Sequence, residues 1–575
     1  MPEPVQFESL LTTEDFQGYE DPEKFKTFVP KLEAYRKKLN DGLIEEYKVE
    51  LPKPIEELID EQFNAKKYLY ESGALSEKEL EITDSKGSKI LKEIADGNWS
   101  CVEVLKAFAH RTVIAHQLTN CALDLFIEDG LKRAQELDDY YAKNGKTIGP
   151  LHGLPVSLKE HYNFRGRVTH GCYVKLVENV TDEHCATLQV LEDLGSIFYV
   201  RTSQPQCLMH LCGNNNYNGL TRNPYNLLLS SGGSSSGEGS LITLGGSVFG
   251  IGSDIGGSIR SPAAFSGCIG LRPSNHRVSL KGCVAAAAGQ ESIVVVFGPL
   301  ARSVDDIELM MKTFINVGQP WNYDQAIPRI PWQEVSKPKP GDLTVAVIRD
   351  DGLVRVSPPI RRGLEETVKK LKAAGVKVVE FTPPHTKLAY DTINKMYNCD
   401  GNKNQREYLA ASGEPLTKLT KWFLNFGDGK KHYTSAENRA LNVDREFIRH
   451  AYHDYFVENK IDFILTPAYN NVAPQQEEVY NWSYTAMYNI LDLPTLAFQT
   501  GLFQDPEIDV WTEEDKNYEY RSDLERLENE NYLPEKFKGA PIGLQLSARR
   551  YHDEELLAGA KTIIDDILKV DLFGP

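Results

Sequence analysis

Residues 228–273 read LLSSGGSSSGEGSLITLGGSVFGIGSDIGGSIRSPAAFSGCIGLRP, and their composition differs from that of the rest of the chain. Glycine and serine dominate this stretch, yet short apolar pieces recur at residues 241–244 and 248–251. A solvated linker has nothing to bury, so the apolar pieces predict buried, tightly turned backbone. A flexible Gly/Ser loop is the alternative, and the fixed charges of Asp254 and Arg260 argue against it.

The second half of this stretch contains the turn DIGGS at residues 254–258. Glycine permits positive φ angles and lets backbone approach a ligand closely. Successive N–H groups in such a turn can point into one concavity, which suits an oxyanion. Serines lie upstream at residues 234–236 and downstream at Ser258. The sequence therefore predicts a hydroxyl-bearing site that stabilises developing negative charge.

At these residues the chain resembles the amidase signature family, whose pattern GGSSxGEG…GxDxGGSIRxPAxxxGxxGLxP is matched from Gly232 to Pro273. The resemblance implies a serine hydrolase that works through a Ser-Ser-Lys triad and an acyl-enzyme. Ser258 corresponds to the nucleophile, Ser234 to the bridging serine, and Lys159, in LHGLPVSLKE, to the base.

The resemblance also implies supporting residues around the triad. The oxyanion and substrate contacts that it implies are the amides of Ile255, Gly256, Gly257 and Ser258, the region of Leu208, and the hydroxyl of Ser235. Asp254 and Arg260 are interpreted as a buried pair that holds the loop and takes no part in the chemistry. The family has a non-proline cis peptide before its bridging serine, here between Gly233 and Ser234. Departures from the commonest pattern, at Glu160, Ser236 and Arg272, leave the triad untouched.

Lys159 serves as a base only when it is neutral. Lowering a lysine pKa from about 10.4 to about 7.5 takes roughly three units, or about 4 kcal/mol, and burial is the means. A lysine that ends an apolar run such as residues 155–158 more often extends to water, but its spacing from Ser234 and Ser258 matches the family. The hypothesis is that Lys159 takes the Ser258 proton through Ser234 and returns it to the leaving amine.

Composition limits the classes of function. The 575 residues carry a net charge of −18, which disfavours a nucleic-acid partner. The chain has no run of 18 apolar residues and no signal-peptide pattern at its amino end, so we expect a soluble, cytoplasmic protein without an integral membrane segment. Nine cysteines without a CxxC pair predict free thiols. No Walker or dinucleotide fingerprint occurs, and no cofactor is expected.

The order of elements favours an α/β fold. Strand, helix and strand patterns alternate over residues 341–384, as in a largely parallel sheet covered by helices. The resemblance implies a single large twisted mixed β-sheet with helices on both faces, spanning residues 86–575 as the amidase signature domain. Residues 1–85 predict a helical N-terminal extension. The helical, aromatic-rich residues 380–460 are the expected source of the substrate-pocket lining, and the charged insertion at 503–538 is expected at the surface.

Two segments resemble the corresponding sequences of fungal acetamidases and general amidases within the family: IADGNWSCVEVLKAF and IAHQLTNC. This resemblance implies an acylamide amidohydrolase that converts small linear amides such as acetamide to the acid and ammonia. Homodimerisation is expected from the family. Three alternatives remain: a fatty-acid amide hydrolase, the amidase subunit of a tRNA-dependent amidotransferase, and a catalytically inactive scaffold.

Two further patterns carry less weight. Residues 233–237 satisfy GxSxG, the nucleophile elbow of another hydrolase class, which would make Ser235 the nucleophile. The histidines available to that alternative are His276, His385, His450, His453 and His552. His450 and His453 also have the spacing to share a helix face, but without further ligands nearby they are interpreted as structural, and no metal is expected.

Overall fold

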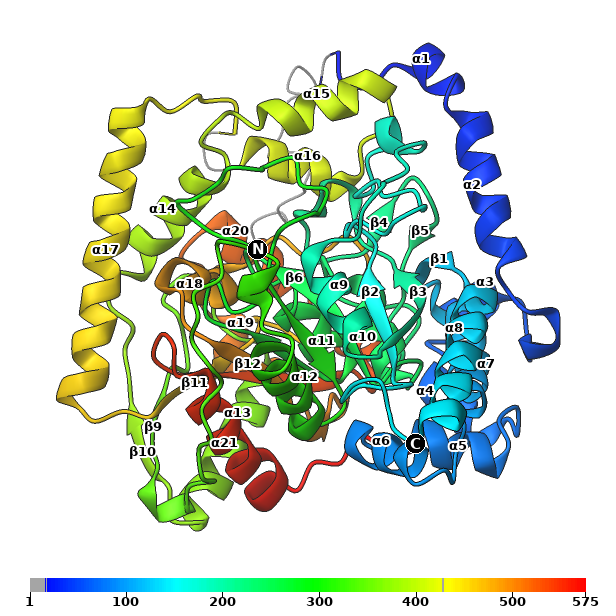
Figure 1. Cartoon of the computed structure of the whole chain (residues 1–575). Coiled ribbons are helices and arrows are strands. Elements are labelled where there is room, and N and C mark those ends of the chain that lie inside the picture. The colour runs from blue at the N-terminus through cyan, green and yellow to red at the C-terminus, as the bar shows by residue number, and fades with distance from the viewer. Residues whose placement is uncertain (1–15, 17, 427–428) are drawn as a thin grey trace.

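One long β-sheet runs through the molecule, a computed structural model that describes residues 16, 18–426 and 429–575 (Figure 1). In the described residues this sheet has 11 strands. In spatial order they are β1 (Ala122–Leu125), β3 (Ile197–Thr202), β2 (Pro155–Lys159), β6 (Phe249–Asp254), β8 (Val296–Ala301), β7 (Ile269–Arg272), β12 (Thr495–Phe503), β13 (Pro541–Ser547), β11 (Phe463–Pro467), β9 (Thr344–Val347) and β10 (Lys377–Glu380). Strands β4 (Asn214–Asn215) and β5 (Gly219–Leu220) form a separate pair.

The sheet is mixed, as expected from the resemblance. Strand β2 pairs in parallel with both β3 and β6, and β9 pairs in parallel with β10 and β11. Between these two parallel parts, β6, β8, β7, β12, β13 and β11 pair antiparallel. The α/β class and the mixed sheet are confirmed.

Apolar side chains on both faces of the strands explain why helices cover both faces of the sheet. Val345 and Val347 of β9 belong to one hydrophobic cluster, whereas the intervening Ala346 and the following Ile348 belong to another. Successive side chains of a strand point to opposite faces, so the sheet separates two apolar cores. Helices such as α13 (Pro358–Ala373) contribute to the first core, and helices such as α14 (Thr386–Tyr397) and α18 (Ser483–Leu491) contribute to the second.

The covering helices mostly follow the predicted patterns. Those after residue 86 are α6 (Gly87–Ala95), α7 (Cys101–Thr119), α8 (Ile127–Asn144), α9 (Ala186–Asp193), α10 (Ser236–Thr243), α11 (Arg260–Ser266), α12 (Val304–Asn316), α13 (Pro358–Ala373), α14 (Thr386–Tyr397), α15 (Lys403–Ser412), α16 (Lys418–Asn425), α17 (Ser435–Glu458), α18 (Ser483–Leu491), α19 (Glu513–Lys516), α20 (Asp523–Glu530) and α21 (Asp553–Lys561). Ser100 caps α7, because its side chain accepts from the Glu103 amide at 3.0 Å.

The N-terminal extension lies along one side of the molecule (Figure 1). Its helices are α1 (Pro22–Lys26), α2 (Val29–Asp41), α3 (Ile55–Asp60), α4 (Ala65–Glu71) and α5 (Glu77–Thr83). Leu58, Leu69 and Ile82 are buried in the same cluster as the β2 side of the sheet, so the extension packs onto the core. A division of the chain at residue 85 stays a prediction.

The first described residues of the extension bind the segment that contains α15 and α16. The Asp21 amide donates to Gly413 O at 3.0 Å, and the Leu416 amide donates to Glu20 Oε1 at 2.7 Å. Lys24 Nζ donates to Ala410 O at 2.6 Å. We call residues 18–26, which include α1, the N-terminal strap, because their hydrogen bonds attach them to the carboxyl end of α15 and the residues that follow it.

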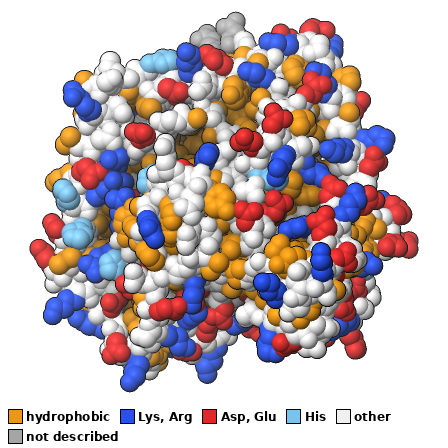
Figure 2. Space-filling view, viewed as in Figure 1, with side chains coloured by type: hydrophobic (Ala, Val, Ile, Leu, Met, Phe, Trp, Pro, Cys, Tyr) orange, Lys and Arg blue, Asp and Glu red, His pale blue; other side chains and the backbone are white. Residues whose placement is uncertain are grey.

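The surface carries both signs of charge. Figure 2 shows acidic and basic side chains interspersed over the face in view. Within the part of the chain that the structure describes, no helix has the length and apolar character to cross a membrane. All nine cysteines are free, as predicted, and most of them are buried. The insertion at 503–538 is largely exposed, as predicted, although Glu528 is buried and accepts from the Asn481 amide at 2.8 Å.

Candidate active site

Two neighbouring parallel strands bring the candidate base to its partners. Lys159 is the last residue of β2, and Ser253 is the fifth of β6. The carboxyl ends of parallel strands meet at one edge of a sheet, where ligand sites commonly form. Lys159 Nζ lies 2.7 Å from Ser234 Oγ and 2.9 Å from Ser253 Oγ. The amine that sequence reasoning selected therefore contacts the predicted bridging serine directly.

Burial sets the state of this amine. Lys159 has an exposed fraction of 0%. Desolvation lowers the pKa of Lys159 to about 7, although the Asp254 carboxylate favours the charged form. A substantial fraction of the amine is thus neutral near pH 7, as a general base requires.

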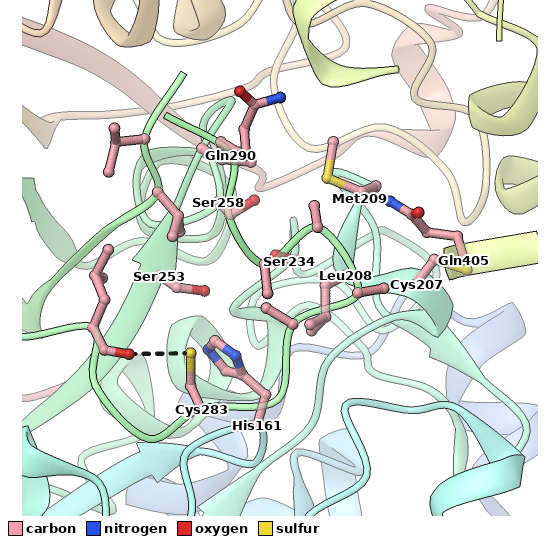
Figure 3. Close-up of a pocket in the computed structure, with 18 of the residues that line it drawn as sticks. His161, Cys207, Leu208, Met209, Ser234, Ser253, Ser258, Cys283, Gln290 and Gln405 are labelled. Atoms are coloured by element: carbon pink, nitrogen blue, oxygen red, sulfur yellow. Dashed lines mark hydrogen bonds between the residues drawn. The ribbon is translucent and has the colours of Figure 1, made fainter. Parts of the chain in front are cut away.

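Ser234 and Ser258 both line one cavity (Figure 3). The peptide between Gly233 and Ser234 is cis, as the resemblance implied. A Cβ on Gly233 would lie 2.4 Å from His210 O, which explains the glycine there. The Ser235 amide donates to Ser258 O at 3.1 Å and fastens the two serine segments together. Among the described residues no hydrogen bond joins the Ser234 and Ser258 hydroxyls, and catalytic hydrogen bonds often tighten only when substrate binds.

Ser235 has a structural position behind the cavity. Its hydroxyl accepts from the Ser253 amide at 3.2 Å, and the residue is fully buried. Ser235 is absent from the cavity lining, as are the five histidines of the nucleophile-elbow alternative. Over the described ranges no group of three or more His, Cys, Asp or Glu side chains is arranged to hold a metal ion. Among these residues the structure therefore gives no support to the nucleophile elbow at residues 233–237 or to metal binding by His450 and His453.

The Asp254 carboxylate organises the loop that carries Ser258. It accepts from the Gly257 amide at 2.8 Å and from the Ile259 amide at 3.1 Å. The Gly257 N–H is therefore engaged, and this amide departs from the predicted oxyanion role. The amides of Ile255, Gly256 and Ser258 donate to no protein acceptor in the described residues. These three remain available to an oxyanion.

Leu208 lies in the wall of the cavity, in the region where the resemblance implied a substrate contact. Its amide donates to Pro205 O at 3.2 Å, while its side chain lines the cavity. Cys207 and Leu208 both have positive φ, at 62° and 64°. Two consecutive non-glycine residues in this conformation store backbone strain of a kind that occurs at ligand sites.

Asp254 and Arg260 form the predicted buried pair. Arg260 Nε and Nη2 each lie 3.0 Å from a carboxylate oxygen of Asp254, and both residues are fully buried. Burial alone would raise the pKa of Asp254, but the Arg260 guanidinium and the Asn489 amide hold that pKa well below its usual value. The pair fixes the loop between β6 and α11.

Sequence reasoning missed three side chains that support this loop from α14 and α18. Tyr397 Oη donates to Ile255 O at 2.7 Å, and Thr485 Oγ1 donates to Gly256 O at 2.6 Å. Asn489 Nδ2 donates to Asp254 at 2.9 Å. These residues lie more than 140 positions later in the chain, and no local pattern marks them. Ser253 was also missed, although its place beside Asp254 in the signature run is a usable signal.

The cavity beside Ser258 has a volume of about 340 Å³. Its walls are mostly apolar, from residues 285–288 (AAAA), residues 293–295 (IVV), Leu280, Met209, Ile255 and Phe297. Gln405 is the one lining residue of the 380–460 segment among those described, and the aromatic residues there pack elsewhere, as Trp422 does against Tyr480. The prediction that this segment lines the pocket was wrong, because a long loop before β8 occupies that place.

Comparisons with known proteins agree with this geometry. The family model described as Amidase matches residues 103–557. The chain belongs to the amidase family. A putative amidase of Schizosaccharomyces pombe is 40% identical over 91% of this amidase and 96% of its own length. An acetamidase of Emericella nidulans is 35% identical over 86% and 91%. A solved structure titled fatty acid amide hydrolase is 60% identical, covers 99% of this chain and 100% of its own, and superposes with a TM-score of 0.98.

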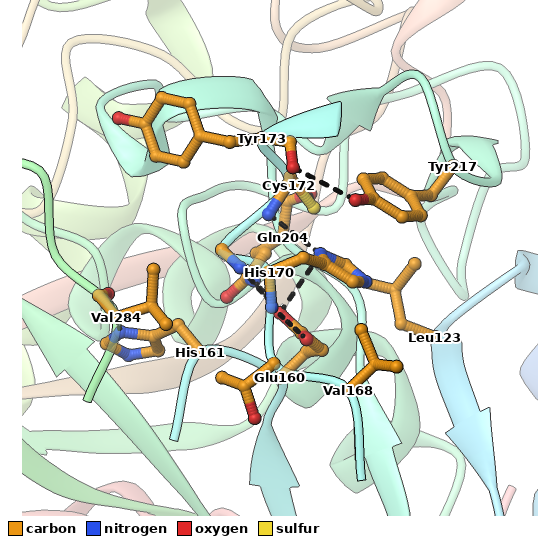
Figure 4. A network of polar contacts seen from close by, with 12 residues as sticks. Leu123, Glu160, His161, Val168, His170, Cys172, Tyr173, Gln204, Tyr217 and Val284 are labelled. Carbon is orange, nitrogen blue, oxygen red and sulfur yellow. Dashed lines mark hydrogen bonds and ion pairs between the residues drawn. The ribbon is translucent and has the colours of Figure 1, made fainter. Parts of the chain in front are cut away.

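The loop that follows Lys159 in this amidase is held by a buried polar network (Figure 4). The Glu160 carboxylate accepts from the His170 amide at 2.8 Å and from Gln204 Nε2 at 2.7 Å. Burial raises the pKa of Glu160 to about 7, although Arg201 opposes the shift. Tyr35 of α2 adds a contact from the extension, with its hydroxyl 3.0 Å from His170 Nε2.

We expect Ser253→Ala to lower kcat/KM by about fivefold. Lys159 Nζ would keep Ser234 and lose its second hydrogen-bond partner, at 2.9 Å, which is worth about 1 kcal/mol. Ser253→Thr keeps a hydroxyl and is the matched control. Steady-state kinetics on one amide check the effect. Equal rates for the alanine variant and the wild type would show that Ser253 does not orient the lysine.

Asp254→Asn should lower the free energy of unfolding by about 3–5 kcal/mol, because it leaves Arg260 charged, buried and unpaired. Asp41→Asn is the matched control, since Asp41 and its partner Lys37 are 61% and 75% exposed and contribute less than about 1 kcal/mol. Urea denaturation of both variants measures the difference. Similar unfolding midpoints for the two variants would contradict the supporting role of the pair.

Proposed function

We propose that the amidase hydrolyses long-chain carboxylic acid amides through an acyl-enzyme. The observation that carries this proposal is the apolar cavity of about 340 Å³ next to Ser258. Cavities of roughly 300–1,000 Å³ hold ligands much larger than acetamide, whose single methyl group would leave most of the walls unfilled. The 60% identity to a structure titled fatty acid amide hydrolase supports the same substrate class.

In this mechanism neutral Lys159 is the base. It takes the Ser258 proton through Ser234, whose hydroxyl it contacts at 2.7 Å. Ser258 Oγ then bonds to the substrate carbonyl carbon. Negative charge forms on the carbonyl oxygen beside the amides of Ile255, Gly256 and Ser258, where each donor is worth about 3 kcal/mol.

Completion of the reaction uses the same relay in reverse. The protonated amine of Lys159 returns its proton through Ser234 to the departing nitrogen, and the C–N bond breaks. Water then attacks the acyl-enzyme while Lys159 again accepts a proton, the ester bond to Ser258 Oγ breaks, and the proton returns through Ser234 to Ser258 as the acid leaves. This assignment of roles rests on the family resemblance, the lysine contacts and the shared cavity of Ser234 and Ser258.

Short amides are the second candidate, favoured by the acetamidase relative at 35% identity. A panel of unbranched primary amides, from acetamide through octanamide to lauramide, distinguishes the two. Each buried methylene contributes about 0.8 kcal/mol, so kcat/KM should rise roughly fourfold per methylene until the cavity is filled. A maximum at acetamide would overturn the long-chain proposal and favour the short-amide candidate.

The panel also tests the remaining alternatives. Activity of the purified single chain without a partner would argue against an amidotransferase subunit, and any turnover excludes an inactive scaffold. The homodimer stays a prediction, and sedimentation at several concentrations tests it.

A further inference from the structure

Most polar side chains in the cavity wall already have a function or a partner. The lining residues with a side-chain nitrogen or oxygen are His161, Tyr173, Ser234, Ser253, Ser258, Gln290 and Gln405, and of these only His161 Nε2 and Gln405 Oε1 are buried without a partner among the described residues. The three serines belong to the triad or contact Lys159. Gln290 Nε2 donates to Met396 O at 2.6 Å, and Gln290 Oε1 accepts from the backbone N–H of Ser292 at 2.9 Å. His161 and Gln405 remain to be explained.

His161 presents a hydrogen-bond acceptor to the cavity. The residue follows β2 two positions after Lys159 and is 3% exposed. Its Nδ1 lies 3.3 Å from Val284 O, and a carbonyl only accepts, so Nδ1 carries the proton. Nε2 is then a bare lone pair, and it is buried without a partner among the described residues.

The surroundings keep this ring neutral. Burial, and then the nearby Lys159, hold the pKa of His161 well below its usual value. Figure 4 shows His161 beside Val284 and apart from the dashed contacts of the Glu160 network. Tyr162 and Phe297 pack against the ring, with centroids at 4.8 Å and 5.7 Å. The orientation of the acceptor is therefore fixed.

Gln405 provides a second unpaired group on another wall. It projects from α15 toward Met209 and Cys207 (Figure 3) and is 3% exposed. Its Oε1 is buried without a partner in the part of the chain described. Buried polar atoms without partners are rare because their desolvation goes uncompensated, and a plain hydrocarbon chain offers neither residue a hydrogen bond.

We propose that His161 and Gln405 determine substrate specificity by binding a hydroxyl group carried by the amide substrate. This inference rests on the proposed hydrolysis of long-chain amides and narrows its substrate class. A hydroxyl has one O–H proton, which it donates either to His161 Nε2 or to Gln405 Oε1, so each substrate hydroxyl pairs one of the two acceptors. A site that holds buried polar atoms for a substrate group discriminates against the analogue that lacks it. The hydroxyl lies either on the amine part or on the acyl part of the amide.

Substrate pairs that exchange one hydroxyl for a methyl group or a hydrogen test this inference. N-(2-hydroxyethyl)lauramide against N-propyllauramide probes the amine part, and 12-hydroxylauramide against lauramide probes the acyl part. The wild type should prefer the hydroxyl member of at least one pair by about tenfold in kcat/KM, equivalent to about 1.4 kcal/mol. The responding pair locates the hydroxyl.

The variants are His161→Phe, which keeps an aromatic ring against Tyr162 and Phe297, and Gln405→Leu, which keeps side-chain size. At least one variant should reduce the preference to within about twofold of unity. The ratio is taken within each enzyme, so a general loss of activity cancels. Preferences equal to those of the wild type in both variants would overturn the inference, as would a wild type without preference in either pair.

Failure of the proposed long-chain activity can be distinguished from failure of the hydroxyl contact. If the wild type hydrolyses acetamide and none of the long-chain amides, the same ratio is measured for glycolamide against propionamide. A preference for glycolamide that His161→Phe or Gln405→Leu abolishes would support the hydroxyl contact for short substrates. A wild type without a preference for glycolamide would contradict the hydroxyl contact as well.

Discussion

Ser258→Ala is expected to lower kcat for amide hydrolysis by about 10⁶-fold, the loss seen when a serine hydrolase loses its nucleophile. The variant keeps the loop, because the bonds of Asp254 to the Gly257 and Ile259 amides involve no Ser258 side chain. Labelling by a fluorophosphonate, followed by intact-mass measurement, should show one adduct on the wild type and none on the variant.

Ser261→Ala is the matched control for this experiment. Ser261 lies three positions later at the start of α11, fully buried, with a hydroxyl that has no partner within the described residues. It should be labelled and should turn over substrate as the wild type does. A Ser258→Ala enzyme that retains more than about a hundredth of the activity would require another nucleophile.

Lys159→Met should lower kcat by about 10⁴–10⁶-fold, because no other group contacting Ser234 can accept the proton. The same variant should be at least as stable as the wild type. A lysine whose pKa is about 7 when folded and about 10.4 when unfolded costs about 4 kcal/mol of stability at pH 7. A more stable and inactive enzyme would separate the chemical role of the amine from any role in folding.

The pH dependence of the wild type follows from the same group. Because the neutral amine is the active form, kcat/KM should rise with pH through about 7 and then level off. The unfolded state binds more protons than the folded state between pH 7 and about 10.4, so this group makes stability increase with pH over that window. Lys159→Met should lack both effects. A flat activity profile for the wild type from pH 5 to pH 9 would exclude Lys159 as the titrating base.

Much of the candidate site could be predicted because the run from Gly232 to Pro273 is contiguous, whereas Lys159, which lies 75 positions before Ser234, was named by the family resemblance. The packing of this loop requires glycine at residues 256 and 257. A Cβ would lie 2.8 Å from Tyr397 Oη at Gly256 and 2.4 Å from Thr485 Oγ1 at Gly257. The run of residues that makes the turn is contiguous, and the apolar strand before Lys159 fixes its burial. Lys159 contacts Ser234, Ser234 and Ser258 line one cavity, and Asp254 pairs with Arg260, whereas Ser235 lies outside the cavity lining; the catalytic roles of these residues stay a prediction.

The walls of the site were not predictable in the same way. Tyr397 and Thr485 reach the loop from helices far along the chain, and their placement depends on how α14 and α18 pack against the sheet. Aromatic content in the 380–460 segment indicated a pocket wall, but aromatic rings pack equally well into a helical core. His161 gave no signal as a sequence feature, because its importance arises from the missing partner of one nitrogen.

The N-terminal strap connects one wall of the cavity to residues that lie 386 and 396 positions earlier in the chain. It fastens the end of the helix that carries Gln405, at Ala410, Gly413 and Leu416. The placement of Gln405 therefore depends in part on Glu20, Asp21 and Lys24, whereas none of these bonds involves Lys159, Ser234 or Ser258.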